Sequence, residues 1–158
     1  MRKYKLFASA ITLISAYCGT VQAEKELLNC RLMSKEMSAS EVTIQGDNGS
    51  IAAFRDSGIC VFDDGRVAEK NFVVANLAAS DFSEGSYSGF SVYTFESGDS
   101  ILLGFTGGWG ADGNRGNYTI VSGTGAYKGV SGDGHFIGLD SPWDGTNWFE
   151  VTIRAVVP

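Results

Sequence analysis

His135, the single histidine of the 158-residue chain, is the first residue to consider for chemistry. Imidazole ordinarily titrates near neutrality, so His135 is a candidate general acid or base, with Glu150 and Asn117 as further candidate polar groups. A rim position or a structural hydrogen bond is the plainer explanation, because His135 directly follows a glycine turn. Ser122 also precedes a glycine, but no G-x-S-x-G sequence surrounds it and no partner that would orient His135 can be identified. A serine hydrolase is not expected, and the catalytic residues stay unassigned.

Four polar residues in glycine-rich loops, Asp112, Asn114, Asp133 and Asp144, have the chemistry to bind calcium. Their spacing does not match the D-x-[DN]-x-[DN]-G pattern, so solvated turn residues explain them better. No cysteine and histidine cluster indicates zinc, and no glycine-rich loop leads from a strand into a helix to hold phosphates. We therefore expect no metal site and no cofactor.

The N-terminus has the three parts of a secretory signal. Basic residues precede an apolar run over residues 6–17, and small residues stand where a signal peptidase would cleave. The run is too short to anchor the chain in a bilayer, and the bulky Tyr17 before Cys18 argues against a lipoprotein. We expect residues 1–23 to be a signal peptide and residues 24–158 to form one domain in the periplasm or outside the cell.

The exported chain would be acidic. Nine basic residues and 18 acidic residues follow residue 23, which gives a formal net charge of −9. Such a surface repels phosphate backbones and anionic lipids, so we expect no nucleic-acid partner and no membrane binding after signal cleavage.

Two cysteines, Cys30 and Cys60, would remain after export. An isolated pair in an oxidising compartment usually forms a disulfide. Closing a loop of about thirty residues would contribute roughly 3 kcal/mol in the chain-entropy model. The alternative, a reactive or metal-binding thiol pair, lacks the close spacing of such motifs.

The sequence predicts β-structure along the whole chain, because short apolar runs alternate with turn signals and prolines are confined to positions 142 and 158. Two segments also allow a helix, namely 24–40 and 71–80. The candidate strands cover residues 41–45, 50–55, 58–62, 66–74, 89–95, 100–106, 117–121, 135–139 and 148–157.

The last strand alternates most clearly. Phe149, Val151, Ile153, Ala155 and Val157 form its apolar face, which predicts a half-buried antiparallel strand. In residues 100–106, the side chains of Ile101, Leu103 and Phe105 alternate in the same way. Consecutive strands of this kind close into a barrel or a sandwich.

Aromatic residues gather in the second half of the chain. The plain explanation is a packed core with loop caps. Alternatively, some of them line a ligand cavity. Trp109 and Trp143 are then the candidates for its mouth, and Tyr93 and Phe105 are candidate ligand contacts.

The segment from Gly123 to Gly134 contains five glycines and suits a tight reversal with positive φ angles. It resembles the glycine-rich return of the allene oxide cyclase and dirigent β-barrel superfamily, here in a bacterial secreted member, and the likeness extends from Tyr87 to Val157. The residues that match the motif are Gly123, Thr124, Gly125, Tyr127, Gly129 and Gly132, and in those families the motif is structural.

The resemblance implies a single antiparallel, allene oxide cyclase-like barrel of about eight strands, often assembled as a trimer. Allene oxide cyclases steer the cyclisation of a fatty-acid epoxide largely by shape, and dirigent proteins fix the stereochemistry of radical coupling. The catalytic carboxylate and asparagine of the cyclases have no counterpart that can be placed in this sequence.

Three functions follow as expectations. The first is a cofactor-free isomerase or cyclase that confines a small apolar or aromatic molecule inside the barrel. The second is a carrier that binds such a molecule without turnover. The third is a structural or interaction module whose interior side chains fill the barrel.

Overall fold

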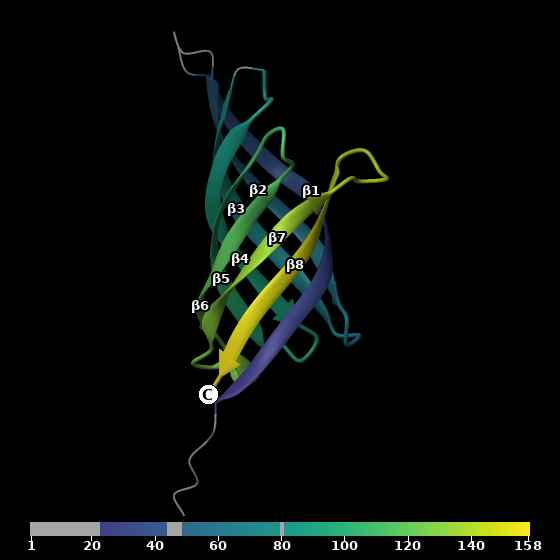
Figure 1. Cartoon of the computed structure of the whole chain (residues 1–158), viewed down its shortest axis with the longest axis vertical. Helices are drawn as coiled ribbons and strands as arrows, with labels where there is room; N and C mark the ends of the chain where they lie inside the picture. The colour runs from purple at the N-terminus through teal and green to yellow at the C-terminus, as the bar shows by residue number, and fades with distance from the viewer. Residues whose placement is uncertain (1–22, 44–48, 80) are drawn as a thin grey trace, which may run out of the picture.

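The computed structural model describes residues 23–43, 49–79 and 81–158, and it shows one closed antiparallel β-barrel (Figure 1). The predicted signal peptide lies almost wholly outside the described residues, as does Cys18. Each strand pairs with the next along the chain, and the last strand pairs with the first. The strands are β1 (Glu24–Thr43), β2 (Gly49–Phe62), β3 (Val67–Ala79), β4 (Gly85–Phe95), β5 (Ser100–Trp109), β6 (Arg115–Gly123), β7 (Ser131–Leu139) and β8 (Thr146–Val157).

Strand alternation decides which side chains fill the barrel. The predicted apolar face of β8 points inward, with Val151 and Ile153 almost fully buried. Ile101 and Leu103 of β5 are likewise inaccessible to solvent. The prediction of an eight-stranded antiparallel barrel is therefore confirmed. In the described part of the chain, no helix has the length and apolar character needed to cross a membrane.

In two parts of the chain the observed strands differ from the predicted secondary structure. Residues 24–40, which also allowed a helix, belong to the 20-residue strand β1. The separate predicted strands 50–55 and 58–62 form one strand, β2, which continues through Asp56. Gly58 makes this continuity possible, because a Cβ atom there would overlap the backbone of β1.

The predicted disulfide is confirmed: Cys30 and Cys60 are bonded across β1 and β2, with their Cα atoms 5.7 Å apart. Both side chains are buried inside the barrel. The bond thus joins two neighbouring strands of the sheet. Such a bond is consistent with a periplasmic or extracellular location.

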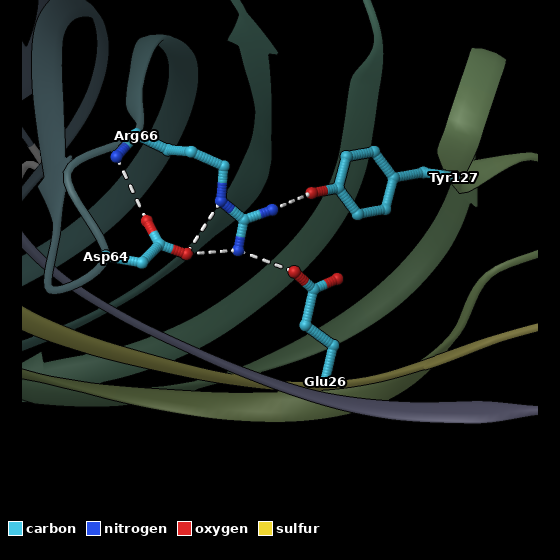
Figure 2. A network of polar contacts seen from close by, with 4 residues as sticks. All are labelled: Glu26, Asp64, Arg66 and Tyr127. Atoms are coloured by element: carbon cyan, nitrogen blue, oxygen red, sulfur yellow. Dashed lines mark hydrogen bonds and ion pairs between the residues drawn. The ribbon is translucent and has the colours of Figure 1, made fainter.

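One end of the barrel is closed by an ionic and aromatic cluster (Figure 2). Arg66 binds the carboxylates of Asp64 and Glu26 and donates a hydrogen bond of 2.7 Å to the hydroxyl of Tyr127. Tyr127 lies in the glycine-rich return and stacks on Phe95, with the ring centroids 5.0 Å apart. The glycine-rich return therefore helps to close this end.

Candidate functional site

The barrel interior contains a cavity of about 300 Å³ toward the opposite end, where β3, β5 and β7 finish. This volume is at the lower end of the range for small-molecule sites. Aromatic and aliphatic side chains make up nine of the fifteen lining residues, and the other six are charged or amide side chains. The lining residues are Glu36, Phe54, Asp56, Lys70, Phe72, Val74, Asn76, Tyr87, Phe105, Trp109, Asn114, Tyr118, Phe136, Asn147 and Phe149.

Inward-facing glycines create the space for the aromatic rings of the wall. A Cβ atom on Gly107 would lie 2.6 Å from the ring of Tyr87, and one on Gly116 would overlap the ring of Phe136. The Tyr87 and Phe136 rings stack with centroids 6.2 Å apart. Glycine in these strands thus sets the shape of the cavity rather than only a turn.

Lys70 is the lining residue of β3 nearest the closed end, and its side chain is buried. Its Nζ donates a hydrogen bond of 2.7 Å to the hydroxyl of Tyr118. Nζ also lies 4.7–5.2 Å from the ring centroids of Phe72, Tyr118 and Tyr93. Burial lowers the pKa of Lys70 to about 7, although the carboxylate of Asp56 acts in the opposite direction.

Asp56 is the buried carboxyl group of the cavity, only 5% exposed. Burial raises its pKa, and the nearby Glu36 carboxylate raises it further, whereas a hydrogen bond from the amide of Asn147 and the charge of Lys70 lower it. The Asn147 Nδ2 to Asp56 Oδ2 distance is 3.4 Å. An amine with a lowered pKa and a carboxyl group with a raised pKa therefore line the same cavity, which suits proton transfer near neutral pH.

Two phenols add neutral hydrogen-bonding groups. Burial raises the pKa of Tyr118 and Tyr87 well above their ordinary value, so both carry a proton at neutral pH. The hydroxyl of Tyr87 donates a hydrogen bond to Oδ1 of Asn114 at the open end. Together these groups can orient a polar atom of a bound molecule.

The predicted ligand contacts occupy different places. Trp109 and Phe105 line the cavity, and the indole Nε1 of Trp109 donates a 3.0 Å hydrogen bond to a backbone carbonyl of the β3–β4 loop. Tyr93 is fully buried beside Lys70. Trp143 is 58% exposed and packs on Trp148, outside the lining of the cavity.

The three candidate catalytic residues do not line the cavity. His135 pairs with Asn117 across β6 and β7, and the alternation that turns Phe136 inward turns His135 outward. Asn117 contributes to a shallow groove on the outer surface. Glu150 is exposed and lies 3.8 Å from Arg31 in a surface ion pair. Within the described residues, no group of three or more histidine, cysteine, aspartate or glutamate side chains is arranged to hold a metal ion.

The polar groups that do line the cavity, chiefly Lys70, Asp56 and Tyr118, were not among the candidates from sequence. A signal for Lys70 existed, because it shares the apolar alternation of Ala68 and Phe72 in a predicted strand. Asp56 carried no comparable signal, since it fell in the gap between two predicted strands.

Comparisons with known proteins address the fold. No family model matches the sequence, and no curated protein matches it. The structure is similar to the pterocarpan synthase dirigent protein GePTS1, with a TM-score of 0.58 and 13% identity over 97% of this chain and 99% of that one. It is also similar to the pterocarpan synthase dirigent protein PsPTS1, with a TM-score of 0.56 and 14% identity over 85% and 96% of the two chains.

A DUF3224-family protein of unknown function from Shewanella oneidensis MR-1 aligns with a TM-score of 0.50 and 15% identity, over 84% of this chain and 96% of that one. Identities of this size establish architecture and leave activity open. These matches support the dirigent side of the resemblance seen in the sequence. The chain therefore has the fold of a dirigent-like β-barrel.

Proposed function

We propose that this protein binds a small aromatic or apolar molecule with at least one polar group inside the barrel, and steers its cofactor-free isomerisation or cyclisation. The observation that carries the proposal is the 300 Å³ cavity, whose lining combines aromatic side chains with a buried lysine, phenol and carboxyl group. A barrel filled with side chains, the structural-module alternative, would not leave this space.

The proposed chemistry uses confinement and proton transfer. The aromatic wall excludes water and fixes the orientation of the bound molecule. Near neutral pH a substantial fraction of Lys70 is unprotonated and can accept a proton, while Tyr118 can donate a hydrogen bond to a developing oxyanion. The dirigent proteins of similar fold are named pterocarpan synthases, which supports the idea that such a barrel can hold a reacting molecule.

Binding can be tested with N-phenyl-1-naphthylamine, a neutral aromatic dye whose emission rises in apolar surroundings. Val74→Phe would fill part of the cavity, whereas Val73→Phe adds the same bulk on the outer face of β3, where Val73 is 59% exposed. We expect Val74→Phe to weaken dye binding at least tenfold and Val73→Phe to leave it unchanged. The reverse pattern would place the dye in the outer groove and contradict the proposal.

Catalysis and carriage differ in what happens to the bound molecule. Mass spectrometry of molecules released from the purified protein would identify a natural ligand, which can then be added back in excess. Conversion beyond one equivalent supports an enzyme. Stoichiometric binding without conversion supports the carrier.

A further inference from the structure

We propose that the amine of Lys70 forms an imine with the carbonyl group of a small aldehyde or ketone bound in the barrel cavity. This inference rests on the ligand-binding role proposed above and assigns it a substrate class, namely aromatic or conjugated carbonyl compounds. It also assigns a covalent step to one side chain.

The surroundings of Lys70 are unusual for a structural lysine. A buried lysine is normally paired with a carboxylate, because an isolated buried charge is costly. In the described part of the chain none of the ion pairs involves Lys70, and its single hydrogen bond goes to the neutral phenol of Tyr118. Lys70 is also the one basic side chain in the lining of the cavity. The amine is therefore available to a bound molecule.

The cavity itself borders the amine, because Lys70 and Asp56 both line it. Lys70 pairs with Gly58 of β2, and Asp56 lies two residues away on the inward face of the same strand. Diagonal neighbours of this kind have side chains about 7 Å apart, so a carbonyl group fits between amine and carboxyl group. The aromatic rings around Nζ would stabilise the positive charge of an iminium ion.

The protonation states favour the reaction. Burial lowers the pKa of Lys70 to about 7, which supplies the nucleophilic free amine near neutral pH. Burial also raises the pKa of Asp56, which helps it to act as a proton donor. The ionisable groups around the amine are Asp56, Glu36, Tyr87, Tyr93 and Tyr118.

The step balances without an oxidant or a reductant. The amine nitrogen attacks the carbonyl carbon, a carbon–nitrogen bond forms while the C=O π bond breaks, and Asp56 donates a proton to the oxygen. The nitrogen then passes one of its two protons to the Asp56 carboxylate, which gives a neutral carbinolamine. Asp56 donates this proton to the hydroxyl group, which leaves as water while the nitrogen lone pair forms the C=N bond, and Asp56 ends as a carboxylate. The resulting iminium ion acidifies the neighbouring C–H bond, which is what an isomerisation by proton transfer requires.

Reductive trapping tests the inference. The purified protein is incubated with cinnamaldehyde and sodium cyanoborohydride, and the adduct is located by peptide mass spectrometry. We expect one adduct per chain at Lys70, formed several times faster at about pH 8 than at about pH 6 because the free amine increases over that range. Lys70→Met should abolish the adduct, and Lys25→Met, at an exposed position of β1, should not.

Cinnamyl alcohol has nearly the same shape but no carbonyl group, so it separates this inference from the proposed function. If the alcohol displaces the aromatic dye but the aldehyde is not trapped at Lys70, the imine is refuted and ligand binding stands. If neither compound displaces the dye, the ligand-binding proposal fails for this class of molecule, and the imine fails with it. Labelling spread evenly over the surface lysines would also overturn the imine, and mapping of the wild-type chain shows this without any variant.

Discussion

Replacing Lys70 by methionine is expected to stabilise the folded barrel at neutral pH. Methionine keeps an apolar stem of similar length and buries no charge. Burial lowers the pKa of Lys70 to about 7 in the folded chain, against an ordinary value of 10.5, and the Asp56 carboxylate offsets part of this effect. Between these two pH values the unfolded chain binds more protons at Lys70 than the folded chain does. The wild-type protein therefore gains stability as the pH rises through that window, whereas the variant does not.

The size of the effect follows from the same two values. Each pKa unit is equivalent to about 1.4 kcal/mol, so the lysine carries a penalty of about 5 kcal/mol below pH 7. The variant leaves the Tyr118 hydroxyl without its hydrogen bond to Nζ, which costs about 1–3 kcal/mol. We expect Lys70→Met to raise the free energy of unfolding by about 2–4 kcal/mol at about pH 6, and to be the less stable protein above about pH 10.5.

Urea unfolding followed by tryptophan fluorescence measures these free energies, with the disulfide kept intact. Wild type, Lys70→Met and the exposed control Lys25→Met are compared at about pH 6, 8 and 10. The control should follow the wild type at every pH. A gain for Lys70→Met that stays constant over this range, or a loss at about pH 6, would refute the reasoning.

Three further predictions concern the return, the disulfide and the cavity. Gly125 has a φ of +58°, and a Cβ atom there would overlap the carboxylate of Asp99. We therefore expect Gly125→Ala to lower the free energy of unfolding by more than about 1 kcal/mol. Ser122→Ala, at an exposed position, should change it little, and thermal unfolding measures both. Cys60→Ala should lower the free energy of unfolding by about 2–5 kcal/mol, and thiol titration of the chain expressed from residue 24 onward should find no free thiol. Because Trp109 lines the cavity, Trp109→Phe should remove most of the tryptophan quenching caused by a bound aromatic dye, and a matched change at Trp143 should preserve it.

The barrel could be predicted from the sequence because its strongest signal, the two-residue alternation of apolar side chains, is also what closes it. Ile153 and Leu103 show this pattern and are fully buried. The first strand was ambiguous for a physical reason. Leu28 and Leu32 are both buried, and residues four apart share a face in a strand as well as in a helix. Pairing with β2 and β8 decides between them, and pairing is information that a local pattern lacks.

The site was harder to predict, because residue type and residue direction point to different positions. His135 has suitable chemistry, but its side chain points outward from β7, and the side chain of its neighbour Phe136 points into the barrel. Lys70 lies on the inward face of β3 among apolar residues, where a charged residue was not expected. The two-residue alternation of the strand is enough to predict that its side chain points inward. Whether a carboxylate neutralises it depends on Glu36 of β1 and Asp56 of β2, which only the folded barrel brings to the same cavity.

Two cations beside aromatic rings show why that distinction matters. Arg66 lies part-exposed over aromatic rings at the closed end, and hydrogen bonds to Asp64 and then Glu26 raise its pKa, so it stays charged in its ion pairs. Lys70 also lies over aromatic rings, but no carboxylate pairs with it in the described structure, and burial lowers its pKa into the neutral range. An arginine in full ionic contact stabilises a structure and offers no nucleophile. A lysine held without such a contact destabilises the fold and gains reactivity, which is why we propose Lys70 as the reactive residue of this barrel.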